Sequence, residues 1–215
     1  MTILTPSNHQ AVFFDFDGVI ADSTSVKVRA FTTLFAEYGA AVQAAVVRYH
    51  LNNGGMPRHE KIRSCFATFA KRPLSEEELA QAGATFSSLV MEEVVAAPLI
   101  PGALETLQQL QRANIPAFVV SGTPADEMRL IVLRKGLTAY FKEVHGSPQA
   151  KPTIVEDILV RYEFTPHHCL FIGDALADYR AAMATGLHFL GIVPDGAPSI
   201  FPGNVPTSPV VSLVA

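Results

Sequence analysis

The sequence predicts an α/β fold in which a doubly wound parallel sheet is interrupted by an inserted all-helical domain. From residue 101 onward, short apolar runs typical of buried strands alternate with helical patterns, and this alternation predicts a parallel sheet covered on both faces. Residues 23–97 instead contain only helical patterns, and they lie between the first apolar run and that alternation. We therefore expect a core domain formed by residues 1–22 and 98–215, and a helical domain formed by residues 23–97.

Composition and charge limit the class of protein. The chain has 215 residues, of which 49% are hydrophobic and 17% charged, so a sizeable buried core is expected. The formal net charge of −4 offers no basic field, which argues against a nucleic-acid binder. The start of the chain does not resemble a signal peptide, and no run reaches the ~20 apolar residues of a membrane-spanning helix. Cys65 and Cys169 are too few for a disulfide framework, so we expect a soluble cytoplasmic protein.

The first strand and the helical region can be placed from local patterns. Residues 11–16 (AVFFDF) form an apolar run that ends in an acid, as a buried strand would. Further helices are expected at residues 44–51 and after Pro57, and Ser75 with Glu78 forms a capping-box pattern at the start of another. The first helix of the region has an apolar face that Gly39 can close in a left-handed cap, formed by Val28, Phe31, Phe35 and Tyr38.

The remaining elements follow one another in regular order. Strands are expected at residues 115–121 (IPAFVVS), 143–145, 169–173 (CLFIG) and 188–193 (HFLGIV). Helices between them are expected at residues 103–113, 123–136, after 151–152, and at 177–186. The proline-rich residues 194–215 are expected to form a surface tail with little regular structure.

Reactive side chains follow the expected strands at the point where each strand ends. Ligands of such sheets bind at the carboxyl ends of the strands, so these side chains should meet at one edge. Taken alone, Asp174 could equally be a helix cap, but the coincidence of all these positions at one edge indicates a functional site. The residues are Asp15 and Asp17 after the first strand, Ser121 after the second, Lys151 after the third, and Asp174 and Asp178 after the fourth.

These residue types indicate phosphoryl-transfer chemistry. A cluster of carboxylates repels itself unless a cation neutralises it, and oxygen ligands of this kind suit Mg²⁺ better than zinc or copper. Lys151, the Ser121 hydroxyl and the backbone N–H groups that begin at Gly122 can hold phosphoryl oxygens. Asp15 can act as the covalent nucleophile, and Asp17 can protonate the leaving oxygen and later activate water.

Four motifs in this order resemble the haloacid dehalogenase superfamily of phosphohydrolases over nearly the whole chain. They are DFDGVIADS (residues 15–23), VVSGTP (119–124), KP (151–152) and GDALAD (173–178). The resemblance implies that Asp15, the backbone carbonyl of Asp17, and Asp174 bind Mg²⁺, with Asp178 supporting the metal site. Helices inserted directly after the first motif resemble the helical cap domain of the branch that contains phosphoglycolate phosphatase and beta-phosphoglucomutase.

The resemblance implies a magnesium-dependent phosphatase that hydrolyses a small phosphorylated metabolite, a sugar phosphate or a compound like phosphoglycolate, through an aspartyl-phosphate. The chief alternative is a phosphomutase of the beta-phosphoglucomutase type, because the sequence does not show how well the cap excludes water. Dehalogenase and phosphonatase chemistry are disfavoured, because those enzymes lack an acid at the position of Asp17. The alternative outside enzymes is a phosphate-binding or receiver-like module. We expect a small-molecule substrate and a monomer or homodimer.

One segment of the helical region is a candidate for substrate recognition. Residues 49–61 (YHLNNGGMPRHEK) join two expected helices and contain a Gly-Gly turn followed by Arg58, His59 and Lys61. Arg58 and Lys61 could meet an anionic or hydroxyl-rich substrate above Asp15. The alternative is an ordinary loop followed by a solvated helix face.

Overall fold

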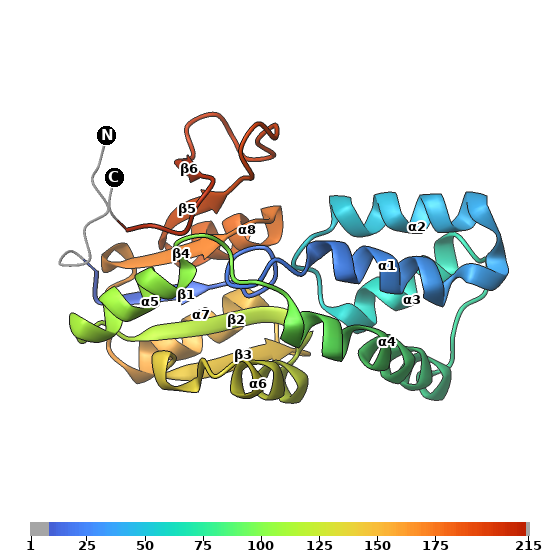
Figure 1. Ribbon diagram of the computed structural model, residues 1–215, viewed down its shortest axis with the longest axis horizontal. Coiled ribbons are helices and arrows are strands. Elements are labelled where there is room, and N and C mark those ends of the chain that lie inside the picture. Colours follow the sequence, from blue (N-terminus) through green and yellow to red (C-terminus); the bar gives the residue numbers. More distant parts are fainter. Residues whose placement is uncertain (1–8, 214–215) are drawn as a thin grey trace.

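The chain folds around one parallel sheet, seen in a computed structural model that describes residues 9–213 (Figure 1). The described residues form six parallel strands in the order β3-β2-β1-β4-β5-β6. Their bounds are β1 Ala11–Phe14, β2 Ala117–Pro124, β3 Glu143–Ser147, β4 Cys169–Gly173, β5 His188–Ile192 and β6 Thr207–Ser208. The parallel sheet confirms the predicted fold class.

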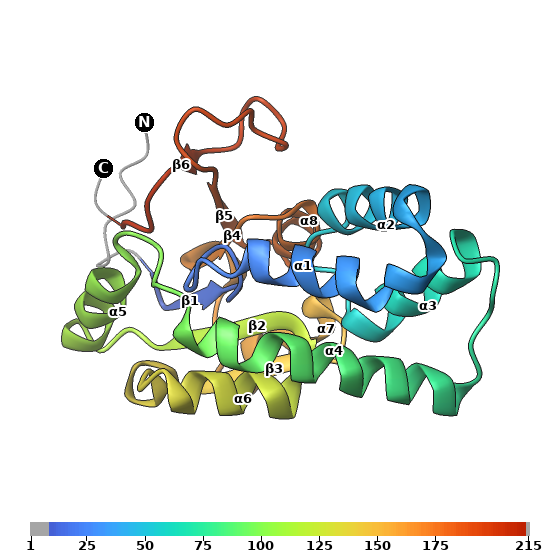
Figure 2. The same cartoon turned by 45° about the vertical axis from the view of Figure 1, so that its right-hand side comes forward.

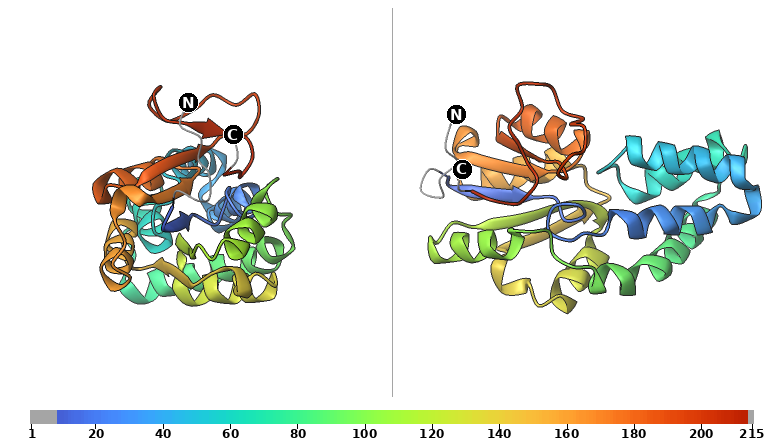
Figure 3. Two further views of the ribbon diagram at one scale, coloured as in Figure 1. Left: turned by 90° about the vertical axis from the view of Figure 1, so that its left-hand side faces the viewer. Right: turned by 45° about the horizontal axis from the view of Figure 1, so that its top comes forward.

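Two pairs of helices cover the sheet, one pair on each face (Figure 3, left). Successive residues of β1 point to opposite faces, so Val12 packs with one pair and Phe13 with the other. Both faces are apolar because both are buried, which is why the strand reads as a continuous hydrophobic run. The first pair is α5 (Ala103–Arg112) with α6 (Ala125–Arg134), and the second is α7 (Lys151–Arg161) with α8 (Leu176–Thr185).

Four further helices are inserted between β1 and α5, and they stand beyond the carboxyl ends of the strands (Figure 2). They are α1 (Thr24–Leu34), α2 (Ala40–Asn52), α3 (Arg58–Thr68) and α4 (Glu76–Ala96). The capping box at α4 is present: the Ser75 hydroxyl accepts from the Glu78 N–H at 3.2 Å, and the Glu78 carboxylate accepts from the Ser75 N–H at 2.8 Å. The first helix ends earlier than predicted, at Leu34, and a short 3-10 turn leads to Gly39, which has a φ of +83° as a left-handed cap would but a ψ of 164° that lies outside the left-handed helical region.

The chain leaves and re-enters the sheet region through two adjacent segments. The Asp22 N–H donates to the Pro98 carbonyl at 2.9 Å, and the Ile100 N–H donates to the Ile20 carbonyl at 3.0 Å. Both hydrogen bonds join residues that flank the segment 23–97. The insertion is therefore tied to the sheet at the carboxyl end of β1, next to the first motif.

The C-terminal segment departs from its prediction as a surface tail. Thr207 pairs with Gly191 of β5, and the segment drawn in red lies beside that edge of the sheet (Figure 3, right). Phe201, Val211 and Leu213 are buried. These apolar residues are separated by prolines and polar residues, so the sequence has no hydrophobic periodicity there that would predict their burial. Among the described residues, no helix is long and apolar enough to cross a membrane.

Candidate active site

The carboxyl ends of the parallel strands bring the residues of the four motifs together. Asp15 directly follows β1, and its N–H donates to the carbonyl of Ile172 in β4 at 3.0 Å, which fixes it between these two strands. Asp174 directly follows β4, and Asp178 lies in the first turn of α8. Ser121 lies near the end of β2, and Lys151 begins α7. One pocket is lined by Asp15, Asp17, Ser121, Gly122 and Asp174.

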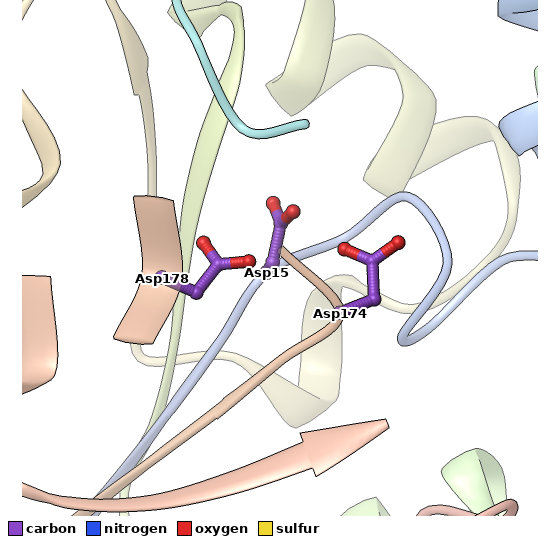
Figure 4. Close-up of side chains that lie close together, drawn as sticks. All are labelled: Asp15, Asp174 and Asp178. Carbon is purple, nitrogen blue, oxygen red and sulfur yellow. The ribbon is translucent and has the colours of Figure 1, made fainter. Parts of the chain in front are cut away.

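Three carboxylates form the acidic centre of the site. Oxygens of Asp15, Asp174 and Asp178 lie within 4.8 Å of one another, and Figure 4 shows Asp15 between the other two. Burial and the neighbouring acids raise the pKa of Asp15 to about 7, although Lys151 opposes the shift. Burial and the same acids hold the pKa of Asp174 well above its usual value. A cluster that resists ionisation on its own, and offers only carboxylate oxygens, fits a hard divalent cation such as Mg²⁺.

Lys151 is the cation that belongs to this cluster. Its Nζ lies 3.1 Å from Asp15 Oδ1 and donates to Asp178 Oδ1 at 2.5 Å. Burial opposes its charge, but the two carboxylates outweigh burial and raise the pKa of Lys151. When all three carboxylates are ionised, one ammonium leaves two formal negative charges, which again matches a divalent cation.

Ser121 lines the pocket, and its hydroxyl can donate a hydrogen bond to a ligand there. It is 1% exposed, and its oxygen accepts a hydrogen bond from the Thr123 N–H at 3.1 Å. Because that oxygen is already an acceptor, the hydroxyl proton is left to donate to a ligand in the pocket. Ser121, Gly122 and Lys151 can thus surround one anion next to Asp15.

Asp17 has a different environment from Asp15, although only one residue separates them. Its carboxylate accepts from the Ser23 hydroxyl at 2.6 Å and pairs with Lys27 of α1. Burial raises its pKa, but Lys27 and the hydrogen bonds from Lys27 and Ser23 outweigh burial, so the pKa of Asp17 lies below its usual value. The side chain is thus held apart from the three-carboxylate cluster. Lys27 also donates to the Thr123 hydroxyl at 2.9 Å. The sequence analysis included Thr123 in the second motif but did not identify Lys27.

Two glycines leave room for the acidic side chains. A Cβ at Gly173 would lie 2.3 Å from Asp178 Cβ. A Cβ at Gly18 would lie 2.2 Å from Asp174 Oδ2, and Gly18 also has a φ of +79°, which disfavours other residues. The glycines of the first and fourth motifs are therefore required by the packing of the site.

The helical insertion reaches the site through the loop between α2 and α3. A Cβ at Gly54 would lie 2.9 Å from Ala175 Cβ, and one at Gly55 would lie 2.9 Å from Ala177 Cβ. On the other side, a Cβ at Gly122 would lie 2.8 Å from the Gly55 carbonyl oxygen. The Gly-Gly turn is thus in van der Waals contact with the ends of both β2 and the β4–α8 loop, so the insertion covers the site.

Arg58 and Lys61 both line the pocket and are both 4% exposed, so neither lies on a solvated helix face. The Arg58 guanidinium donates to the two carboxylate oxygens of Glu127 at 2.6 and 2.5 Å, and to the Ser87 hydroxyl at 2.7 Å. Lys61 Nζ lies 3.2 Å from Nδ1 of His50, a buried residue at the end of α2. The sequence analysis did not identify Glu127, whose partner Arg58 is 69 residues away. It also did not identify His50, although His50 lies within the segment 49–61, only 11 residues from Lys61.

Comparisons with known proteins agree with this arrangement. The sequence model of the haloacid dehalogenase-like hydrolases matches residues 9–186. Phosphoglycolate phosphatase 1 of Pseudomonas aeruginosa is 27% identical over 184 residues, which are 82% of this chain and 66% of that protein. The chain therefore spans just under two thirds of the length of this relative.

Solved structures support the fold. Beta-phosphoglucomutase from Clostridium difficile superimposes with a TM-score of 0.71 at 21% identity, covering 86% of this chain and 85% of the other. The CbbY protein from Rhodobacter sphaeroides, in complex with phosphate, gives a TM-score of 0.72 at 20% identity and 94% coverage of both chains. The match of the family model over most of the chain is the finding that decides the family: this protein is a member of the haloacid dehalogenase-like hydrolases.

Proposed function

We propose that this hydrolase is a magnesium-dependent phosphatase that acts through an aspartyl-phosphate on Asp15. The observation that carries the proposal is the position of the Asp15 carboxylate, which is buried, shares a cluster with Asp174 and Asp178, and lies 3.1 Å from Lys151. The phosphoglycolate phosphatase among the relatives supports phosphate-ester hydrolysis as the reaction class.

The reaction would proceed in two steps at phosphorus. A carboxylate oxygen of Asp15 forms a bond to phosphorus while the ester bond breaks, and Asp17 gives its proton to the leaving oxygen. Water then attacks the aspartyl-phosphate while Asp17 takes up a proton, and phosphate and free Asp15 are released. Lys151, Ser121 and the N–H of Gly122 hold the phosphoryl oxygens in both steps. The proton that Asp17 takes from water in the second step is the one that it gives to the leaving oxygen in the next turnover, and the ion pair with Lys27 favours the ionised form of Asp17 between these two transfers.

A bound Mg²⁺ would neutralise the acidic cluster and the phosphoryl group. Its ligands would be Asp15, the backbone carbonyl of Asp17, and Asp174, with Asp178 supporting the site. The chemistry of the cluster supports this assignment, since burial and like charge already resist the ionisation of Asp15 and Asp174 without a metal.

We assign residues 1–22 and 98–215 to the core domain and residues 23–97 to a helical cap that selects the substrate. The substrate would be a small phosphorylated metabolite, because the loop at Gly54 and Gly55 closes over the pocket. Of the two cap residues that the sequence predicts for specificity, Lys61 is the one we propose, because Arg58 is already paired with Glu127. Cytoplasmic location and a monomeric or homodimeric state remain predictions.

Phosphate release from aryl and alkyl phosphates tests the proposal. The wild-type protein should release phosphate with Mg²⁺, should lose activity in EDTA, and should regain it when Mg²⁺ is restored. Asp15→Asn should lower activity by at least about 10³-fold without loss of fold, because an amide is a poor nucleophile and a weaker ligand. Full activity after exhaustive chelation, or in folded Asp15→Asn, would contradict the mechanism. Transfer of phosphate to a sugar in place of water would favour the phosphomutase alternative.

A further inference from the structure

Lys61 differs from the other cations at or next to the pocket because it has no acidic partner among the described residues. Lys151, Arg58 and Lys27 each form an ion pair, with Asp178, Glu127 and Asp17 respectively. Within residues 9–213, no carboxylate lies within ion-pair distance of Lys61, and the neighbour of its Nζ is the imidazole of His50 at 3.2 Å. Lys61 therefore carries the pocket's unbalanced positive charge on the side of the insertion.

A buried ammonium without a counter-ion is costly, so its retention requires an explanation. Burial, and then the nearby charge of Lys27, lower the pKa of Lys61 to about 7. Burial also lowers the pKa of His50 to about 3, with Lys61 contributing, so the imidazole is neutral. A neutral imidazole can accept a hydrogen bond from the ammonium and fix its direction, but it cannot balance the charge.

The two side chains are brought to the pocket by helices α2 and α3 of the insertion. His50 lies in the last turn of α2 and Lys61 in the second turn of α3, and the tight loop between these helices is packed against the core at Gly54 and Gly55. The ideal Cβ of Gly55 lies 3.5 Å from Lys151 Nζ, so this loop adjoins the group that faces the phosphate. His50, Lys61 and Asp15 all line the same pocket.

We propose that Lys61, oriented by His50, binds a second anionic group of the substrate, a carboxylate or a second phosphate, while the first phosphate lies at Asp15. The inference rests on the proposed phosphatase function and narrows it to small phosphomonoesters that carry another negative charge. The second anionic group of the substrate would be the counter-ion of Lys61, since no carboxylate of the described residues lies within ion-pair distance of it. Arg58 is less suited to this role, because both terminal nitrogens of its guanidinium already donate to the Glu127 carboxylate.

Selectivity between matched substrates tests the inference. The probes are 2-phosphoglycolate and 1,2-ethanediol bisphosphate, which carry a carboxylate or a second phosphate, and ethyl phosphate, which carries neither. Lys61→Met should lower the ratio of kcat/KM for a doubly anionic probe over ethyl phosphate by about 10- to 100-fold, the loss typical of a charge-assisted hydrogen bond. The probe whose ratio falls identifies the second group. Arg63→Met is the matched control, since Arg63 lies on the same helix but is exposed and pairs with Glu76, and it should leave both ratios unchanged.

Binding provides a readout that does not depend on turnover. In an Asp15→Asn background, adding Lys61→Met should raise the Kd of 2-phosphoglycolate or of the bisphosphate by a similar factor, and that of ethyl phosphate far less. Equal losses for all three compounds, or no loss for any, would overturn the inference. Failure of the wild-type protein to hydrolyse any probe would instead overturn the proposed function, while the difference in Kd would still decide the role of Lys61.

Discussion

Asp15 and Asp17 show how one short motif supplies two chemically different carboxyl groups. Asp15 is surrounded by Asp174, Asp178 and Lys151, and burial among acids raises its pKa to about 7. Asp17 points to Lys27 and Ser23 on the side of the insertion, and the pKa of Asp17 falls below its ordinary value. Separate environments for two titratable groups fit the proposal that Asp15 binds metal and attacks phosphorus while Asp17 transfers protons.

Asp17→Asn tests this separation of roles. The change should lower kcat by about 10²- to 10⁴-fold for ethyl phosphate, because an alkoxide leaving group needs a proton. The loss should be smaller for p-nitrophenyl phosphate, whose leaving group is stable without protonation. Steady-state kinetics with both substrates at saturating Mg²⁺ provide the measurement. An equal loss for the two would mean that Asp17 acts mainly by shaping the metal site.

Lys61→Met should stabilise the protein while impairing its proposed specificity. The pKa of Lys61 is about 7 in the folded state against an ordinary 10.5, so the cost of its charge is fully present below pH 7. That cost is relieved as pH rises from about 7 to 10.5, where the folded-state amine has lost its proton. The groups that act on this amine are His50, Lys27, Cys65, Asp15 and Lys151.

Thermal melts test this prediction, because it fixes how the Tm difference between Lys61→Met and the wild type changes with pH. Its Tm should exceed that of the wild type at pH 6.5 by several degrees, since about 1 kcal/mol shifts Tm by ~2–4 °C at this size. The difference should shrink at pH 9.5, whereas Arg63→Met should show no such trend. A Tm advantage that grows with pH would contradict a cationic, buried Lys61.

Single residues could be predicted from the sequence where their neighbours are local or where parallel strands align them. Asp15 and Asp174 each directly follow a strand of recognisable pattern and Ser121 lies near the end of another, and such strands end at one edge of the sheet. Lys27 and Glu127 were missed because each occupies an unremarkable position in a helix. Lys27 is 10 residues from its partner Asp17, and Glu127 is 69 residues from its partner Arg58. A single sequence without relatives gives no sign of such pairs.

At the scale of elements, prediction succeeded where a local signal was strong. The capping box at Ser75 and Glu78 requires only two positions three residues apart, and it forms as expected. The strand at Thr207–Ser208 has two residues, too few to show any periodicity. Its place in the sheet depends on tertiary contacts, such as the hydrogen bond from the Val211 N–H to the Pro101 carbonyl at 2.9 Å.

Adding even a methyl group to the loop between α2 and α3 should lower activity. Gly55→Ala adds a methyl group that would lie 2.9 Å from Ala177 Cβ, and it does so at a φ of +71°. The cap loop would have to withdraw, so kcat/KM should fall by about 10-fold or more for every substrate. Gly136→Ala is the matched control, because Gly136 has a φ of +70° and nothing within 4 Å of its Cβ position.

The control separates backbone strain from closure. Both variants should lose about 1–2 kcal/mol of stability from the left-handed backbone, measured by denaturant unfolding. Only Gly55→Ala should lose activity beyond that effect. If Gly136→Ala lost as much activity, strain rather than the approach of the loop would be the cause.

At the scale of the molecule, the insertion and the sheet region are joined by more than the two chain crossings. One hydrophobic cluster runs from Phe14 of β1 through Phe31 of α1 to Phe86 of α4. Arg58 of α3 adds an ion pair to Glu127 of α6, which belongs to the sheet region, and the side chains of this pair are 4% and 9% exposed. Burial favours the neutral form of Glu127, but Arg58 and Ser87 outweigh burial and keep the pKa of Glu127 below its usual value.

This buried pair should hold the insertion closed over the site rather than select the substrate. Arg58→Ala or Glu127→Ala leaves the other charge buried and unpaired, a change that typically costs about 3–5 kcal/mol. Each should lower kcat/KM by a similar factor for 2-phosphoglycolate and ethyl phosphate, and the double variant should lose less than the two singles combined. Arg134 and Glu92 form a matched pair between α6 and α4 that is exposed, and removing it should change kcat/KM by less than about 2-fold. A loss confined to 2-phosphoglycolate in Arg58→Ala would instead assign Arg58 to the substrate's second anionic group, beside or in place of Lys61.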